Sequence, residues 1–312
     1  MPSPSDVTVI VCTRDRPEML QGALEAIHSS TPPETSILVV DSASSTSETR
    51  DVAAAAGVGY VRSGKGLSVA RNVGITTADR PIVIFTDDDC RPTEGWVEKL
   101  IAHFDEDAVS AATGRMLDHA VSADAPYHRQ TRYTRPLSGI DAGHGAVMAF
   151  RREVLLRLGG FDDLMGAGQR MAGAEDLDIF IRILRGGTGI VHDGTCVVLH
   201  ANTRVGDAYV ALHRGYGRGL GALVSKWLRT DPAFGVSVGW RLSGRTIVRI
   251  ARARLAGKRG DHDLAMLMGM IDGIRATWRT PLIGERFVPP WQSGGIPALV
   301  TIAASAAREE PA

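Results

Sequence analysis

The sequence predicts an α/β fold in which helices flank a mostly parallel sheet, followed by a helical C-terminal extension. Short apolar runs rich in β-branched residues occur at 7–12, 36–40, 59–62 and 81–85. Stretches with helical periodicity separate these runs, and this alternation favours parallel strands joined by right-handed crossovers. The chain has 312 residues, of which 44% are hydrophobic and 22% charged, so it can bury a substantial core.

Local signals place the remaining elements. A helix is expected to begin at Pro17, because proline suits the first helical position. Further elements are predicted as helices over 67–75, 96–104, 152–158 and 174–184, and as strands over 146–150 and 189–199. Residues 116–143 are polar and show no periodicity, so we expect a long loop there.

Helices are expected from 206 onward. The clearest one would be capped by Asp261 and carries an apolar stripe. The residues of that stripe are Leu264, Leu267, Met268, Ile271, Ile274 and Trp278.

Cysteine usage and hydropathy suggest a compartment. Cys12, Cys90 and Cys196 are far apart and odd in number, which argues against a disulfide framework and favours a reducing environment. The first residues lack a signal-peptide pattern, and no apolar stretch reaches the roughly 18 residues that a transmembrane helix needs. We therefore expect a cytoplasmic protein.

An acidic cluster follows the fourth predicted strand, in the segment FTDDDC at 85–90. The carboxylates of Asp87, Asp88 and Asp89 would lie at the carboxyl end of the sheet, where open α/β folds bind ligands. Asp87 and Asp89 would point to one side if the strand continues that far. Two such oxygen ligands suit Mg²⁺ or Mn²⁺, whereas the alternative interpretation is a solvated acidic turn.

A second acidic cluster, Glu175, Asp176 and Asp178, opens the helix predicted over 174–184. One of these carboxylates could act as a general base. The helix dipole also favours acidic residues in a first turn without any catalytic role, so position alone leaves both interpretations open.

Two nucleotide-binding patterns are excluded. The segment at 59–66 nearly matches a phosphate-binding loop, but Gly66 stands where the pattern needs a hydroxyl. The G-x-G-x-x-G pattern of dinucleotide-binding proteins does not follow the first strand.

Six segments in order carry a family pattern. They are VTVIVCTRDRPEML at 7–20, ILVVDSAS at 37–44, GLSVARNVGI at 66–75, IVIFTDDDC at 82–90, GAVMAFRREVLLRLGGFDD at 145–163 and GAEDLDIFIR at 173–182. Together the first two thirds of the chain resemble the family 2 glycosyltransferases. The resemblance implies the GT-A fold and an inverting transfer of a sugar from a nucleotide-diphosphate sugar to an acceptor hydroxyl.

The resemblance also implies roles for individual residues. Those implied to contact the donor are Thr13, Arg14, Arg16, Asp41, Arg71, Asn72, Asp87 and Asp88. Asp89, together with Asp87, is the implied ligand of a divalent cation, Mn²⁺ or Mg²⁺. His200 matches an additional ligand of some members, although a lone histidine at a strand end is equally explained as an ordinary residue. Asp176 matches the catalytic base, with Glu175 beside it.

We expect a catalytic domain over 1–205, with a donor-binding half at 1–115 and an acceptor half at 116–205. A basic helical region over 206–312 would follow. Between 204 and 259 only Asp207 and Asp231 oppose many arginines and lysines. This region is either a helical appendage with a solvated basic face or a peripheral contact with an anionic membrane. Such a contact at the inner face of the membrane would suit a lipid-linked acceptor.

Two other functions remain open. A nucleotidyltransferase that makes a nucleotide sugar would carry a glycine-rich loop after the first strand, where this chain has CTRDRPE at 12–18. A non-catalytic nucleotide-sugar-binding partner would not need both Asp89 and Asp176. No nucleic acid is expected as a partner, because the basic region contains no recognised binding motif.

Overall fold

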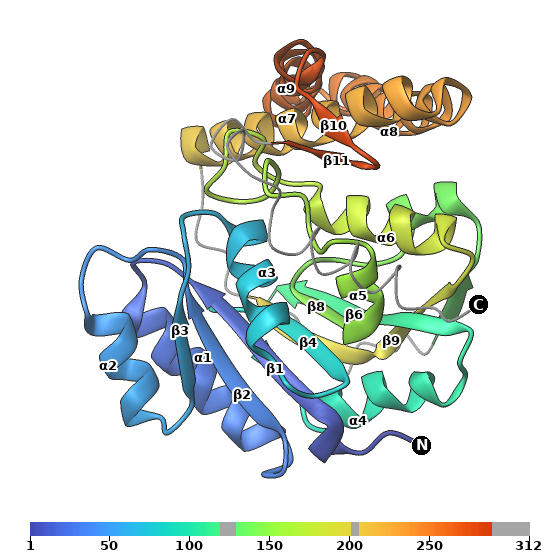
Figure 1. Ribbon diagram of the computed structural model, residues 1–312. Coiled ribbons are helices and arrows are strands. Elements are labelled where there is room, and N and C mark those ends of the chain that lie inside the picture. Colours follow the sequence, from blue (N-terminus) through green and yellow to red (C-terminus); the bar gives the residue numbers. More distant parts are fainter. Residues whose placement is uncertain (119–128, 201–205, 289–312) are drawn as a thin grey trace. The chain divides into compact units, whose positions relative to one another are not determined.

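The computed structural model describes residues 1–118, 129–200 and 206–288. Contacts within the chain divide it into two compact units, which are described separately. Unit 1 comprises the described parts of Met1–Phe161 and Ile179–Asn202, and unit 2 those of Asp162–Asp178 and Thr203–Ile296. Helix α6 (Glu175–Arg185) therefore begins in unit 2 and continues in unit 1 (Figure 1).

Unit 1 is built around a mixed sheet with the strand order β3-β2-β1-β4-β8-β6-β9-β5. Its first four strands are parallel: β3 (Gly59–Arg62), β2 (Ser36–Asp41), β1 (Val7–Thr13) and β4 (Ile82–Asp87). The others are β8 (Val147–Arg151), β6 (Val109–Asp118), β9 (Gly189–His200) and β5 (Cys90–Pro92), with β7 (Gln130–Tyr133) paired to β9. Strand β8 is antiparallel to both β4 and β6, while β6 and β9 are parallel.

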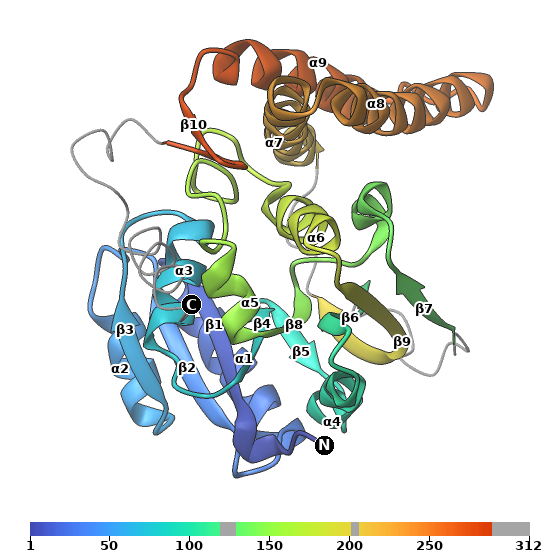
Figure 2. The same cartoon turned by 45° about the vertical axis from the view of Figure 1, so that its right-hand side comes forward.

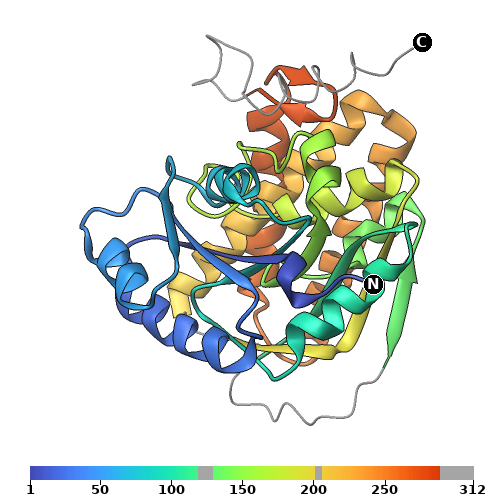
Figure 3. The same ribbon diagram turned by 60° about the horizontal axis from the view of Figure 1, so that its bottom comes forward.

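Helices cover both faces of this sheet. One face packs against α1 (Pro17–Ser30), α2 (Glu48–Ala55) and α4 (Trp96–Ile101), as the views in Figures 2 and 3 show. The other packs against α3 (Leu67–Thr77), α5 (Arg152–Arg157) and the second half of α6. Because β1 is buried on both faces, its sequence VTVIVC is apolar almost throughout instead of alternating. The predicted fold class is thus confirmed.

The prediction of one long loop over 116–143 is wrong in part. Strand β6 continues to Asp118, and β7 and the short 3₁₀ helix η3 (Pro136–Asp141) also lie within the segment. Residues 119–128 fall outside the described part. Strand β6 (VSAATGRMLD) escaped prediction because alanine, serine and glycine carry little strand propensity; its pairing with β8 and β9 stabilises it instead.

Unit 2 contains three long helices, α7 (Gly206–Thr230), α8 (Pro232–Leu255) and α9 (Asp261–Thr277). A hairpin of β10 (Leu282–Ile283) and β11 (Arg286–Phe287) follows them. Helices α7 and α9 approach so closely that their backbones touch. A Cβ atom added to Gly221 of α7 would lie 2.1 Å from the carbonyl oxygen of Met270 in α9, and one on Gly273 of α9 would lie 2.2 Å from that of Arg218. Only glycine permits this approach.

The apolar stripe predicted on α9 is not the face that packs. The buried residues of α9 include the small side chains Ala265, Gly269 and Gly273. Leu264, Met268, Ile271 and Trp278 of the stripe are each exposed over 41–50% of their surface. The predicted cap differs as well, because Gly260 is the N-cap and Asp261 is the first helical residue. Within the described residues, no helix combines the length and hydropathy that crossing a bilayer requires.

Candidate active site

The loop after β1 is held by the middle aspartate of the acidic cluster. Thr13 donates a hydrogen bond of 2.6 Å to Oδ2 of Asp88, and Arg16 contacts Oδ1 of the same carboxylate at 2.7 Å. Burial raises the pKa of Asp88, although Arg16 and Thr13 act in the opposite direction. Thr13 and Arg16, both predicted to contact the donor, therefore bind Asp88 instead, and these contacts fix the loop after β1.

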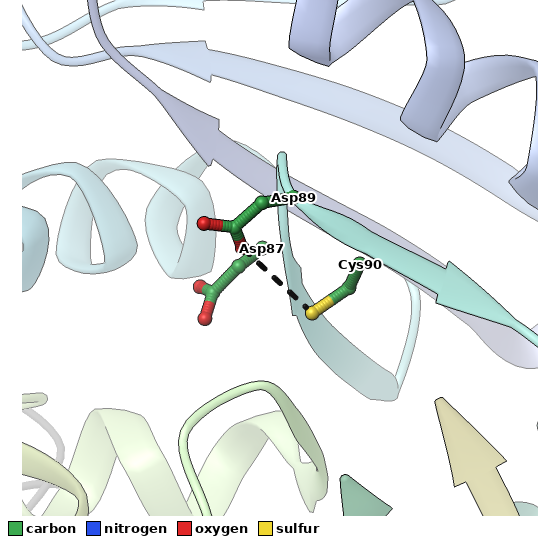
Figure 4. Close-up of side chains that lie close together, drawn as sticks. All are labelled: Asp87, Asp89 and Cys90. Atoms are coloured by element: carbon green, nitrogen blue, oxygen red, sulfur yellow. Dashed lines mark hydrogen bonds between the residues drawn. The ribbon is translucent and has the colours of Figure 1, made fainter. Parts of the chain in front are cut away.

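The other two aspartates come together at the end of β4, although the strand itself stops at Asp87 (Figure 4). A turn through Asp88 and Asp89 leads directly into β5, so strand alternation is not what aligns the side chains. The turn places ligand atoms of Asp87, Asp89 and Cys90 within 4.8 Å of one another. Oxygen ligands at this spacing fit a hard divalent cation. Burial raises the pKa of the Cys90 thiol far above its ordinary value. A hard cation such as Mg²⁺ also prefers the oxygen ligands of Asp87 and Asp89 to sulfur.

The electrostatic environment of the cluster also fits a cation. The pKa of Asp87 is raised to about 6, chiefly by burial and also by the neighbouring carboxylates of Asp89 and Asp88, while Arg71 and His144 act in the opposite direction. The guanidinium of Arg71 lies 3.5 Å from Oδ1 of Asp87, and the Arg71 side chain is itself buried. Like charges this close repel one another, and a bound cation would relieve the repulsion.

A guanidinium and an imidazole flank Asp89. Arg16 lies 3.1 Å from its Oδ2 atom, and Nε2 of His200 lies 3.6 Å from Oδ1. His200 reaches this position because β9 pairs with β5, which aligns His200 with Cys90. The structure therefore brings the predicted histidine to the cluster. By contrast, Arg14 is exposed and contacts its neighbour Asp15.

Asp41 is fully buried at the end of β2, and this chain supplies its hydrogen-bond donors. The Ser44 N–H donates to Oδ1 at 2.7 Å, while Tyr60 and Arg62 donate to Oδ2 at 2.8 and 3.2 Å. The sequence interpretation missed Tyr60 and Arg62, although both lie on the neighbouring strand β3. They order the loop after β2 around Asp41, which is predicted to contact the donor.

Asn72, predicted beside the diphosphate, makes a reciprocal pair with the backbone of Phe161. Its Nδ2 atom donates to the Phe161 carbonyl at 2.9 Å, and the Phe161 N–H donates to its Oδ1 atom at 2.8 Å. Phe161 in turn places its ring 5.3 Å from the Arg71 guanidinium. These contacts tie α3 to the GGFDD segment and orient Arg71 toward Asp87.

The second acidic cluster occupies the first turn of α6, in unit 2. Glu175 is buried, Asp176 is half-buried, and Oδ1 of Asp176 accepts the Leu177 N–H at 2.8 Å. The residue before this turn, Ala174, has a left-handed φ of 62°. Among the described residues, non-glycine residues with positive φ also include Asp15 and Ala43, which adjoin the loops of Arg16 and Asp41. Backbone strain of this kind concentrates at functional sites.

A buried charge centre in unit 2 was also missed from the sequence. Nζ of Lys226 lies 2.6 Å from Asp162 and 2.8 Å from Asp178, and all three side chains are fully buried. Burial alone would raise the pKa of Asp162, but Lys226 and the Phe287 N–H outweigh it and hold the pKa below its ordinary value. Lys226, one of the basic residues of the helical region, therefore does not lie on a solvated face. Its place within the apolar run GALVSKW was the available signal.

Comparison with known proteins agrees with this geometry. Residues 8–159 match the family model described as "Glycosyl transferase family 2". The pre-mycofactocin glycosyltransferase of Mycobacterium tuberculosis is 25% identical over 235 residues, which cover 69% of this chain and 47% of that protein. The chain thus spans about half the length of the curated relatives it matches.

Solved structures share the fold. A mannosyltransferase from Pyrobaculum calidifontis, in complex with GDP-Man and Mn²⁺, aligns with a TM-score of 0.59 at 21% identity, covering 99% of this chain and 82% of its own. Glucosyl-3-phosphoglycerate synthase from M. tuberculosis, in complex with Mn²⁺, UDP and glucosyl-3-phosphoglycerate, aligns with a TM-score of 0.50 at 16% identity, covering 69% and 77%. The fold is that of GT-A proteins, and residues 8–159, just under half of the chain, match glycosyltransferase family 2.

Proposed function

We propose that this protein is an inverting, metal-dependent glycosyltransferase that moves a sugar from a nucleotide-diphosphate sugar to an acceptor hydroxyl. The observation that carries the proposal is the carboxylate cluster of Asp87 and Asp89 at the end of β4, inside a family 2 domain. Structural neighbours with bound Mn²⁺ and nucleotides add support.

On the donor side, Asp89 and Asp87 would hold Mn²⁺ or Mg²⁺, with His200 as a further ligand beside Asp89. The ion would supply positive charge next to the donor diphosphate. Arg16 and Arg71 would add their own positive charges to the same region. Asp88, Thr13 and Asn72 would act by holding these groups in place, while the loops around Asp41 and Arg14 would line the nucleotide pocket.

On the acceptor side, Asp176 would take the proton from the attacking hydroxyl. Removing this proton makes the oxygen a better nucleophile for direct displacement at the anomeric carbon. Attack on the face opposite the leaving group inverts the configuration at the anomeric carbon. Glu175, buried in the same helical turn, would fix the start of α6 and keep its partner carboxylate oriented.

The proposed acceptor is a saccharide or a lipid-linked saccharide, and the proposed location is the cytoplasm. Support for the location comes from Cys12, Cys90 and Cys196, which are all free. Burial raises the pKa of Cys12 and of Cys196 to about 12, so both stay protonated and unreactive.

A thermal-shift screen of UDP-, GDP- and dTDP-sugars, each with Mn²⁺ and with a chelator, tests donor binding without a known acceptor. A ligand that binds the native state raises the melting temperature by mass action. We expect one nucleotide class to stabilise the protein in the presence of Mn²⁺ alone. A folded protein that shifts with none of these donors would contradict the proposal.

Two substitutions separate the proposed roles. Asp89→Ala should abolish transfer and weaken Mn²⁺-dependent donor binding, since it removes a ligand. Asp176→Asn should leave the donor-induced shift intact while lowering turnover by about 100-fold or more, the contribution typical of a general base. Wild-type turnover in the Asp176 variant would remove its role as base.

A further inference from the structure

Helix α8 carries its largest apolar side chains on the outside of unit 2. Trp240 is 80% exposed and Leu255 is 89% exposed. Val236, Ile247 and Val248 are exposed over about half of their surface or more. Val236, Trp240 and Ile247 are spaced by four and seven residues, so they form one stripe along the helix.

The inner face of α8 combines small side chains with Leu242, and Phe234 at the start of the helix packs its ring against Trp227 of α7. Gly235, Val238, Leu242 and Thr246 form this face and recur at spacings of three and four. A surface helix ordinarily buries its large apolar residues and exposes its polar ones. Helix α8 instead carries apolar side chains on both faces, and a contiguous exposed apolar stripe of this kind marks an interaction surface.

The charge on α8 itself has one sign, although Arg249 pairs with Asp263 of α9 at 2.7 Å. Residues 232–260 contain no aspartate or glutamate. The basic residues of that segment are Arg241, Arg245, Arg249, Arg252, Arg254, Lys258 and Arg259. Arg245 and Arg252 are exposed, and each lies three or four residues from the exposed Val248, so they border the exposed apolar side chains on the Val248 side of the helix. The surface therefore combines large apolar side chains with positive charge.

Basic residues of the neighbouring helix α7 have other partners. Lys226 is buried between Asp162 and Asp178, and Arg229 donates to the carbonyl oxygens of Thr277 and Thr280. Arg214 pairs with Asp272. Arg249 of α8 is paired as well, with Asp263. What distinguishes α8 is that its exposed arginines lie beside the exposed side chains of Val248 and Leu255.

We propose that the outer face of α8 binds an anionic lipid surface, with Trp240 and Ile247 inserted at the level of the headgroups. Arginines flanking such a stripe extend their aliphatic stems along the apolar layer and place their guanidinium groups on lipid phosphates. A second copy of this chain fits the face less well, because two surfaces without acidic residues would repel each other. Membrane binding does not require the transfer reaction; the use of a lipid-linked acceptor at that surface rests on the proposed function.

Vesicle sedimentation of the full-length protein tests the proposal. We expect binding to vesicles of phosphatidylcholine mixed with phosphatidylglycerol, no binding to phosphatidylcholine alone, and release by salt. The double variant Arg245→Ser/Arg252→Ser should bind about 25-fold more weakly, from about fivefold per arginine at an anionic surface. Trp240→Ser/Ile247→Ser should weaken binding by about tenfold or more through the loss of inserted apolar area.

Trp278→Ser is the matched control, because Trp278 is an exposed tryptophan of unit 2 outside α8, and it should bind like the wild type. Circular dichroism establishes that each variant is folded. Equal binding to neutral vesicles, or binding unchanged by both double variants, would overturn the proposal. So would a dimer in analytical ultracentrifugation that Trp240→Ser dissociates while no vesicle binding occurs. The assay contains no donor, so its failure leaves the donor-binding test unaffected.

Discussion

The two units bury their side chains by opposite rules. In unit 1, large apolar residues of strands and helices interlock, and Phe150 lies among the rings of Phe85, Phe161 and Phe180. In unit 2, α7 and α9 meet through glycines, and many large side chains of α8 and α9 lie outside, although Leu242 and Met270 are buried. Hydrophobic periodicity therefore indicates the packed face in unit 1 and the exposed face in unit 2.

The difference shows what an apolar stripe establishes. A stripe indicates that a helix has two unlike faces, but it does not identify the face that packs against the protein. Close backbone contact gains dispersion energy and buries backbone area without large side chains. A glycine-rich helix pair can therefore pack closely while its bulky side chains remain exposed on another face.

The largest effect is expected from the charge centre of unit 2. Lys226→Met should lower the free energy of unfolding by about 3–5 kcal/mol, because it leaves two buried carboxylates without their cation. Urea unfolding followed by circular dichroism measures the loss. Lys258→Met, at an exposed lysine, should stay within about 0.5 kcal/mol of the wild type. Equal stability of the two variants would contradict this account of Lys226.

The same centre predicts a response to acid. Because the pKa of Asp162 is lower in the folded protein than its ordinary value of 3.8, its ionised form stabilises the fold. That stabilisation is present above the ordinary value and is lost as the pH falls through the folded pKa. The free energy of unfolding of Asp162→Asn, measured by urea unfolding at a series of acidic pH values, should therefore depend less on pH in this range than that of the wild type.

A smaller effect tests the glycine contacts. Gly221→Ala should destabilise the protein by about 1–3 kcal/mol, because the new methyl group would overlap the Met270 carbonyl. In an ordinary helix the same change stabilises by about 0.5–1 kcal/mol. Gly244 of α8 provides the control, since a Cβ there meets nothing within 4 Å. Opposite signs at the two positions are expected, and stabilisation at both would show that α7 and α9 do not touch.

The smallest effect is expected on the outer stripe of α9. Met268→Ser should change stability by no more than about 0.5 kcal/mol, because half of the side chain is exposed. If the stripe faced a core, removing the side chain of Met268 would destabilise by about 2–5 kcal/mol. A large loss of stability in thermal or urea unfolding would therefore show that this face is buried.

Much of unit 1 could be predicted because its local and tertiary preferences agree. Strands such as β1 and β4 are apolar, β-branched and bounded by polar turns, and the helices between them carry regular stripes. The acidic cluster after β4 and the acidic first turn of α6 could also be predicted, because each adjoins an element that the local pattern already indicates. Strands β6 and β7 were not, since they pair only because neighbouring strands are already in place.

The sequence by itself determined the fold class, the order of the first strands and the segments that carry the carboxylates, because these depend on periodicity and on turn chemistry. Tertiary structure alone decided that Asp88 binds the loop after β1, that His200 reaches Asp89, and that Lys226 is buried between two aspartates. It also decided which faces of α8 and α9 are exposed. These features join residues far apart in the chain, and no local pattern fixes a contact of that kind.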